Sequence, residues 1–380
     1  MKKCNILRTL TGKIILAVIV MSIPVHGLYA AQNGTKAYVL NSNYDTSGST
    51  ISTIKVNVKH TNVQATEDIL SQINQDSEIR SYKNYLFVIE KYQGDNIIVI
   101  KKNNISSPVN QYAFPEGTNP QDIIFKDIKN AYICGLGSND IFLVDPVKGK
   151  IKKKISLAKF ADSDGFAEPK SMAIVGGYLF VALQRTVNYE VKEDSLIAVI
   201  DTKTNKLYDV DPGTDGKQAI TLAGRNPGFI TYNKTTGKIY VSNAGKYVSD
   251  GNYAVDNYGG IEVVDPATFT SEGMLINDDD LNGSPGSIVI YSATKGYIAS
   301  GDFAENIVTP FNPSDGSVSS KLSGTNSSYI PQIALDKEGY LYVTDRSLEN
   351  PGIIIYKVKN NSKVSGPTST GDMAPTGIAF

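Results

Sequence analysis

Histidine and cysteine are almost missing from this chain of 380 residues, which has two of each. Cys4 and His26 fall in an N-terminal leader described below, so His60 and Cys134 are what remains for chemistry. A lone histidine cannot build a His-rich zinc or iron site. The chain also has no Gly-x-Ser-x-Gly elbow for a nucleophilic serine and no Cys-x-x-Cys-His motif for covalent haem. These absences argue against most metal-dependent and triad-based enzymes.

The two remaining residues have ordinary structural interpretations. His60 stands at the end of a predicted outer strand, and we expect it to be an exposed edge residue. Cys134 follows Ile133 inside a predicted strand, where we expect a small buried hydrophobe rather than a reactive thiol. With one cysteine left after the leader, no disulfide can form within the chain, and a chain of this length buries enough apolar surface without one.

A hydrophobic run long enough to cross a membrane is also lacking. The apolar stretch from Ile14 to Ile23 falls short of the ~20 residues that a bilayer requires. Basic residues precede it, and small residues suited to cleavage follow at Ala30 and Ala31. This pattern is typical of a secretory signal peptide. We therefore expect residues 1–30 to be removed and the chain to be exported, to a periplasm, the cell surface or the medium, without a membrane span. A retained anchor is the alternative.

Positive charge is not concentrated anywhere in the chain. Without residues 1–30, 33 Lys and Arg face 38 Asp and Glu, a formal charge of −5. Binding to nucleic acid requires clustered Lys and Arg. No nucleic-acid partner is therefore expected.

What the chain does contain is a repeat. An aromatic residue followed by aliphatic residues and a polar loop occurs seven times, at intervals of 45 to 60 residues. The seven aromatics are Tyr38, Phe87, Tyr132, Phe180, Tyr240, Tyr297 and Tyr342. Units of ~40–50 residues with four short strands each are typical of β-propeller blades. The sequence therefore predicts an all-β fold, a seven-bladed propeller of four-stranded antiparallel blades.

Proline marks the start of the first strand in most units, where a residue without an N–H group is tolerated. These prolines are Pro120, Pro169, Pro227, Pro285, Pro331 and Pro375. In the second unit, which lacks the proline, we expect residues 77–81 to supply the first strand. The mature chain begins with a second strand, residues 36–40, and ends with a lone first strand, residues 375–380. Because an open ring would leave sheet edges unpaired, we predict that the last strand pairs with the first blade.

The predicted domain organisation follows from these markers. Residues 1–30 form the signal peptide, and residues 31–380 form one propeller domain. The predicted blades lie at about 36–62 together with 374–380, 76–104, 119–158, 168–211, 226–276, 284–322 and 330–364.

Three segments resemble the YVTN-type repeats of the YncE-like β-propeller family: GKIYVSNAG from Gly237, GYLYVTD from Gly339 and IEVVDPATF from Ile261. The resemblance covers nearly all of the mature chain, but its motifs specify strands and turns rather than chemistry. It implies a seven-bladed propeller, secreted or at the cell surface, that serves as a binding or scaffolding module. The chain departs from the pattern in long loops of its fourth and fifth units.

Loops between second and third strands gather around one mouth of a propeller, because every blade runs in the same sense. We predict a ligand site there. Its expected residues are Asn41, Tyr44, Glu90, Tyr92, Gln184, Arg185, Tyr189, Asn243, Tyr247, Tyr258, Asp302, Phe303 and Arg346. Tyrosine combines a rigid apolar ring with a hydroxyl group, which suits a small amphipathic molecule or a partner protein. The alternative is that these loops pack on one another and shield the ring.

Calcium is the one cofactor that the sequence leaves open, and none is predicted outright. Asp162, Asp164 and Glu168 alternate in an acidic loop, and calcium binds roughly six to eight oxygens. The EF-hand pattern is incomplete, because Ala173 stands where its last glutamate is expected. The acidic run 277–280 is a second candidate.

The preferred function is an exported, non-enzymatic propeller that binds a small molecule or a partner protein at the channel mouth. One alternative is a propeller hydrolase or lactonase with a carboxylate or calcium site, for which Glu90, Asp302 and Asp345 would supply the carboxylates. The other alternative is a cell-surface structural module with no small-molecule site.

Overall fold

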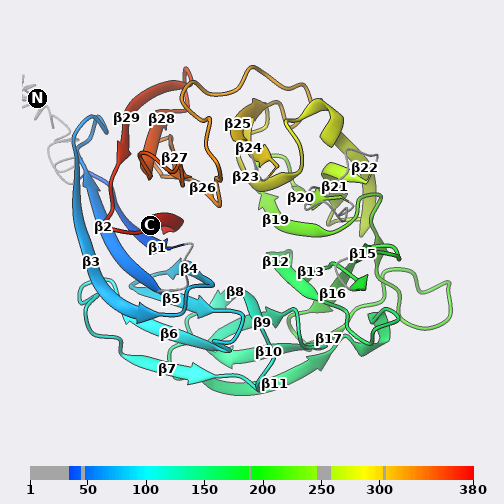
Figure 1. Ribbon diagram of the computed structural model, residues 1–380. Helices are drawn as coiled ribbons and strands as arrows, with labels where there is room; N and C mark the ends of the chain where they lie inside the picture. The colour runs from blue at the N-terminus through cyan, green and yellow to red at the C-terminus, as the bar shows by residue number, and fades with distance from the viewer. Residues whose placement is uncertain (1–33, 44–47, 188–189, 246–257, 303–304) are drawn as a thin grey trace, which may run out of the picture.

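The computed structural model describes residues 34–43, 48–187, 190–245, 258–302 and 305–380. Within these residues the strands form seven blade sheets arranged in a ring, together with one two-stranded hairpin (Figure 1). Consecutive strands of a blade pair antiparallel, and the first strand of each blade lies nearest the axis of the ring. The predicted all-β, seven-bladed propeller is confirmed.

The first three blades use residues 36–156 together with the last strand of the chain. Blade one contains β1 (Lys36–Ser42), β2 (Ser49–Val56), β3 (Val63–Ile73) and the last strand of the chain, β30 (Ala374–Ala379). Blade two contains β4 (Ser77–Tyr82), β5 (Tyr85–Glu90), β6 (Asn96–Lys101) and β7 (Asn110–Ala113). Blade three contains β8 (Pro120–Asp127), β9 (Asn130–Gly135), β10 (Asp140–Asp145) and β11 (Lys150–Ser156), and the 3-10 helix η1 (Ala158–Phe160) follows it.

Blades four and five follow the same plan with additions. Blade four contains β12 (Pro169–Val175), β13 (Tyr178–Leu183) and β16 (Leu196–Asp201), with β17 (Lys206–Leu207) and β18 (Ile220–Thr221) sharing its outer edge. Its long loop carries the hairpin β14 (Thr186–Val187) and β15 (Glu190–Val191). Blade five contains β19 (Pro227–Asn233), β20 (Lys238–Ala244), β21 (Gly259–Asp265) and β22 (Thr270–Asn277), followed by η2 (Asp278–Asp280).

Blades six and seven complete the ring. Blade six contains β23 (Pro285–Ser292), β24 (Lys295–Gly301) and β25 (Asn306–Phe311), and blade seven contains β26 (Ile333–Leu335), β27 (Tyr340–Asp345), β28 (Gly352–Lys357) and β29 (Ser362–Thr368). Irregular chain takes the outer place in blade six: the Ser319 N–H donates to the Pro310 carbonyl and the Leu322 N–H to the Val308 carbonyl, both at 2.8 Å.

The two ends of the chain close the ring. β30 pairs antiparallel with β1, with Val39 opposite Ile378 (Figure 1). Ile378 is 2% exposed, and Lys102 of blade two donates to the last carbonyl, that of Phe380, at 2.8 Å. Asn41 adds a side-chain tie, since its Nδ2 donates to the Thr370 carbonyl and its Oδ1 accepts from the Thr370 hydroxyl at 2.6 Å. The predicted pairing of the C-terminal strand with the first blade is confirmed.

The hydrophobic core lies between blades rather than at the axis. In the described residues it divides into seven clusters, each with side chains from two neighbouring blades. The seven marker aromatics are all buried in these clusters. Cys134 is fully buried as predicted, and burial raises the pKa of its thiol well above the usual value.

Two marker tyrosines also tie their blades to the next one. The hydroxyl of Tyr132 donates to Asn205 Oδ1 at 2.6 Å, and the hydroxyl of Tyr297 donates to Asn361 Oδ1 at 2.8 Å. Both asparagines occupy the fourth position after the third strand of the following blade, with positive φ. A left-handed residue is required there, and asparagine tolerates that conformation.

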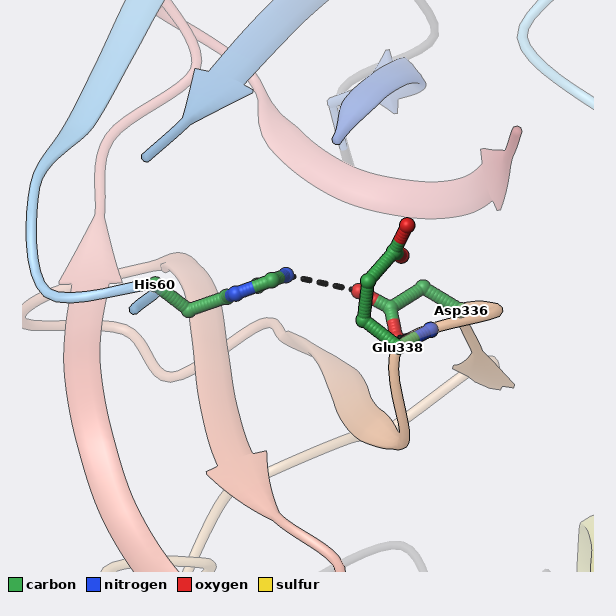
Figure 2. A group of neighbouring side chains, drawn as sticks. All are labelled: His60, Asp336 and Glu338. Carbon is green, nitrogen blue, oxygen red and sulfur yellow. Dashed lines mark hydrogen bonds and ion pairs between the residues drawn. The ribbon is translucent and has the colours of Figure 1, made fainter. Parts of the chain in front are cut away.

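His60 occupies the same turn position in blade one, and the prediction that it is exposed was wrong. Its φ is 57°, its exposed fraction is 0%, and its Nε2 lies 2.7 Å from Asp336 Oδ2 of blade seven (Figure 2). The ring stacks on Tyr340 with 3.7 Å between centroids. The Tyr342 hydroxyl donates to the same Asp336 oxygen at 3.3 Å. The closing interface thus replaces the tyrosine–asparagine tie with a buried His60–Asp336 pair, which strand patterning alone did not indicate.

Candidate functional site

In five of the blades, the residue that directly follows the marker proline lines a cavity in the interior of the ring. Gln121, Lys170, Gly228, Gly286 and Thr376 occupy this position and line two cavities. The side chain is long and polar in blades three and four, and absent in blades five and six. This asymmetry places long polar side chains on one side of the ring interior and leaves open space on the other.

The larger cavity has a volume of about 670 Å³ and lies against blades four to seven. Apolar groups form much of its wall. They are Phe229, Ala244, Pro285, Ala299, Tyr329, Ile330, Pro331 and Leu348. Leu348 is 81% exposed and Tyr329 is 49% exposed, which places a large apolar surface at the rim.

The smaller cavity has a volume of about 280 Å³ and is lined mainly by blades two to four, with residues of blades one, five and seven completing its wall. Charged groups dominate its wall. They are Asp76, Glu78, Arg80, Lys91, Asp122, Lys170 and Arg346. The two cavities share Lys170, Gly228, Phe229, Tyr329 and Pro331. They therefore adjoin, with an apolar compartment on one side and a charged compartment on the other.

The carboxylates of the smaller cavity are matched with cations. Lys91 Nζ lies 2.7 Å from Asp76 Oδ1, and Arg80 contacts Glu78 Oε1 at 2.9 Å and Asp122 Oδ1 at 3.1 Å. Burial raises the pKa of Glu78, but the charges of Arg80 and Lys91 outweigh it and lower the pKa overall. For Asp122, burial outweighs the attraction of Arg80 and raises the pKa.

Lys170 differs from these groups. Its Nζ donates to the neutral Gln121 Oε1 at 2.5 Å, and in the described part of the chain no carboxylate oxygen lies within 4.0 Å of it. Burial, followed by the nearby charge of Lys91, lowers the pKa of Lys170 to about 8. A lysine with a depressed pKa in a cavity is a candidate functional group on both geometric and electrostatic grounds.

Three of the residues predicted for the mouth lie in these walls. Gln184 and Asp302 line the larger cavity, and Arg346 lines the smaller one. They stand at the ends of second strands or just after them, on the face of the ring that the sequence indicated.

Other predicted residues line neither cavity. Asn41 and Asn243 are fully buried, and Glu90 is 5% exposed. Asn41 ties the closing strands, Glu90 accepts the Asn74 N–H at 2.6 Å, and Asn243 donates to Glu262 Oε2 at 3.2 Å. These three side chains hydrogen-bond within the fold.

The aromatic and basic candidates on the loops are more exposed. Tyr92 is 61% exposed and Tyr258 is 45% exposed, the latter with the Arg225 guanidinium 5.0 Å from its ring centroid. Arg185 forms an ion pair with Glu193 and donates to the Asp194 carbonyl at 2.6 Å. The remaining candidates lie outside the described residues: Tyr44, Tyr189, Tyr247 and Phe303.

The sequence reasoning missed the inner-strand residues, and a usable signal existed for them. Gln121, Lys170 and Thr376 each follow a marker proline, so the position after these prolines was a place to look for cavity-lining residues. Arg80 and Glu78 belong to the blade that lacks the proline. No comparable marker points to them.

Metal binding has limited support in the described residues. There, one group brings three His, Asp or Glu side chains within 4.8 Å of one another: His60, Asp336 and Glu338 (Figure 2). Asp336 already accepts hydrogen bonds from His60, Tyr342 and the backbone N–H of Tyr340. This satisfied carboxylate is suited to holding blades together rather than to coordinating an ion.

The calcium candidates are arranged as turn residues. Asp162 Oδ1 accepts the Asp164 N–H at 3.0 Å, and Glu168 Oε2 accepts the Thr186 N–H at 2.5 Å. Burial raises the pKa of Glu168, and nearby Asp164 adds to the effect. Calcium at this loop stays a prediction.

Comparisons with known proteins give the fold. No protein-family model and no curated protein sequence matches the chain. Among solved structures, a protein provisionally assigned as a 6-phosphogluconolactonase from Bacteroides fragilis is similar with a TM-score of 0.63 and 12% identity, over 90% of this chain and 97% of that one. Streptogramin B lyase is similar with a TM-score of 0.57 and 13% identity, over 80% and 86%.

Hydrazine synthase of Kuenenia stuttgartiensis is similar with a TM-score of 0.57 and 15% identity, over 76% of this chain and 79% of that chain. At such low identities the likeness extends to the propeller fold and not to the chemistry. The resemblance to YncE-like repeats is thus confirmed as a seven-bladed fold, and the family name stays a prediction. No helix in the described ranges is long and apolar enough to cross a membrane.

Proposed function

We propose that this protein is an exported, non-enzymatic propeller that binds a small molecule in the two adjoining cavities at the ring axis. The observation that carries the proposal is the contrast between them: an apolar compartment of about 670 Å³ opens beside a charged compartment of about 280 Å³. Small-molecule sites typically have ~300–1,000 Å³ with apolar walls and a few polar groups. The pair matches an amphipathic ligand.

The rim of the larger cavity supports this proposal. Leu348 is 81% exposed, and Tyr329, in the same wall, is 49% exposed. Large apolar side chains gathered at a concave surface are typical of interaction sites. Covering them with an apolar ligand would remove this surface from water, at roughly 25 cal/mol per Å².

Two glycines help to keep the cavity hollow. A Cβ atom at Gly286 would meet its nearest neighbour, the Ala299 carbonyl oxygen, at 3.5 Å, and one at Gly228 would meet the Ser242 carbonyl oxygen at 4.0 Å. These distances correspond to ordinary contact, so backbone crowding does not require glycine at either position. The absence of side chains there leaves room for a ligand.

The hydrolase or lactonase alternative receives less support. Of its three candidate carboxylates, Asp302 lines a cavity. Glu90 is buried and binds the Asn74 N–H, and Asp345 is 7% exposed with its Oδ1 bound to the Ser347 N–H. The three carboxylates therefore have separate surroundings and do not form one catalytic site.

The experiment is titration with Nile red, a neutral apolar dye whose fluorescence rises on leaving water. Two tyrosines provide a matched pair: Tyr329 lines both cavities and Tyr291 lines neither, yet both are 49% exposed. We expect saturable binding of one dye molecule. Tyr329→Ala should weaken it about tenfold, because an aromatic contact contributes about 0.5–1.5 kcal/mol beyond the area it buries. Tyr291→Ala should leave it unchanged.

Gly286→Leu is a second test that removes no contact. It should fill part of the larger cavity and abolish dye binding while the thermal midpoint stays within a few degrees of the wild-type value. Equal dye affinity in the wild type, Tyr329→Ala and Gly286→Leu would place the binding elsewhere and contradict the proposal.

A further inference from the structure

We infer that the ligand is an organic acid, with an apolar body in the larger cavity and a single carboxylate bound by Lys170. This inference rests on the proposed function, because it names the chemical class that the same site accepts. It is carried by where Lys170 lies, by what the surrounding charges already contact, and by the aromatic groups beside it.

Lys170 lies at the junction of the two compartments. Among the described residues that line both cavities, Lys170 is the one with a charged side chain. It follows Pro169 at the start of β12, at a bulge, and the paired residues on either side of it, Pro169 and Ser171, hold its backbone in place. An ammonium group has three donors, and the structure uses one of them, toward Gln121. The others are available to an acceptor that enters the junction.

The neighbouring charges favour an anionic ligand over a cationic one. Asp76, Glu78 and Asp122 each contact Lys91 or Arg80 at 2.7–3.1 Å. A ligand cation would compete with these contacts. A ligand anion would instead meet Lys170, whose Nζ donates to the neutral amide of Gln121.

The same surroundings favour one negative charge rather than two. Glu78 and Asp76 lie close enough to raise the pKa of Lys170, although burial and Lys91 lower it further. A phosphate dianion at Lys170 would therefore be repelled by both carboxylates, while a carboxylate monoanion places a single charge against the ammonium. Buried charge pairs are favourable only when their charges match and their hydrogen bonds are satisfied.

The apolar part of the acid has a defined place. Phe229 and Tyr329 line both cavities, as Lys170 does. A ring or chain attached to a carboxylate at Lys170 would extend past these aromatic side chains into the larger cavity. Aromatic carboxylic acids have both required features.

The test compares 2-naphthoate with 2-naphthamide, two probes that share a ring system and differ in charge. The chain has no tryptophan, so naphthalene fluorescence can be followed directly during titration. We expect the wild-type protein to bind 2-naphthoate at least tenfold more tightly than 2-naphthamide.

Lys170→Met keeps the length of the side chain and removes its charge. It should abolish the preference for the acid and change 2-naphthamide affinity by less than twofold, whereas Lys170→Arg should retain the preference. Lys295→Met is the matched control, because Lys295 is half-buried, donates one hydrogen bond, to the Val358 carbonyl at 2.5 Å, and lines neither cavity. It should behave like the wild type.

The outcomes separate this inference from the proposed function. Saturable binding of Nile red and 2-naphthamide without a preference for 2-naphthoate would overturn the inference and keep the proposed function. A preference that survives Lys170→Met would also overturn it. If no probe binds the folded wild type, both fail. The comparison in the wild type needs no variant, so a folding defect in Lys170→Met cannot obscure the result.

Discussion

Replacing His60 tests how the ring is closed. The His60 side chain is fully buried, its Nε2 lies 2.7 Å from Asp336, and its ring stacks on Tyr340. His60→Ala would leave the Asp336 carboxylate buried without its partner. Breaking a buried pair in this way costs about 3–5 kcal/mol. We therefore expect His60→Ala to lower the free energy of unfolding by about that amount.

His60→Asn should be milder. Asn205 and Asn361 occupy the equivalent turn position in blades four and seven, with φ of 53° and 58°, and accept hydrogen bonds from marker tyrosines. An asparagine at position 60 tolerates the same backbone and can accept from Tyr342 or donate to Asp336. We expect it to recover roughly half of the loss in His60→Ala, of the order of 2 kcal/mol.

The assay is urea unfolding at pH 7, followed by far-ultraviolet circular dichroism. Lys59→Ala, in the same turn but exposed, is the control and should shift the free energy by less than about 0.5 kcal/mol. A double-mutant cycle with Asp336→Asn should give a coupling energy of at least about 1 kcal/mol. A coupling near zero, or a His60→Ala variant as stable as Lys59→Ala, would refute the claim that this pair holds blades one and seven together.

Two further predictions concern the closing strand and the pH dependence of the site. Ile378 is 2% exposed in the strand that completes blade one. Ile378→Ala should therefore lower the free energy of unfolding by about 2–5 kcal/mol and speed amide hydrogen exchange in β1 and β30. Unchanged exchange would contradict this prediction. The affinity for 2-naphthoate should fall as pH rises through about 8, because the pKa of Lys170 is near 8 and the ammonium is the form that binds. The affinity for 2-naphthamide should stay constant over the same range, and an equal fall for both probes would contradict the assignment of this titration to Lys170.

Strand periodicity predicted the fold because each blade must bury its strands against the two neighbouring blades, so the same residue pattern repeats. The second strand of each blade is covered on both faces, so a large buried aromatic such as Tyr132 or Tyr297 recurs in it. The number of these aromatics along the sequence gives the number of blades. The unpaired first strand at the C-terminus predicted the closure for a similar reason, since an inner strand such as β30 requires a sheet to join.

The site was harder to predict, because burial and hydrogen bonding decide the role of a polar side chain. In the sequence, Asn41 and Lys170 are both polar residues near the end of a strand. In the structure, Asn41 is buried and hydrogen-bonds to Ser52 and Thr370 of the closing blade, whereas Lys170 lines a cavity. His60 likewise occupies an outer turn, and its contacts with Asp336 and Tyr340 of the neighbouring blade seven explain its burial. Contacts between residues far apart in the sequence cannot be read from local patterns.

The most direct test of the functional account is a crystal structure of the protein with 2-naphthoate bound. The account predicts the carboxylate at hydrogen-bond distance from Lys170 Nζ, ~3 Å, and the ring between Phe229 and Tyr329. A ligand bound on the outer surface, or one whose carboxylate points away from Lys170 into solvent, would contradict it.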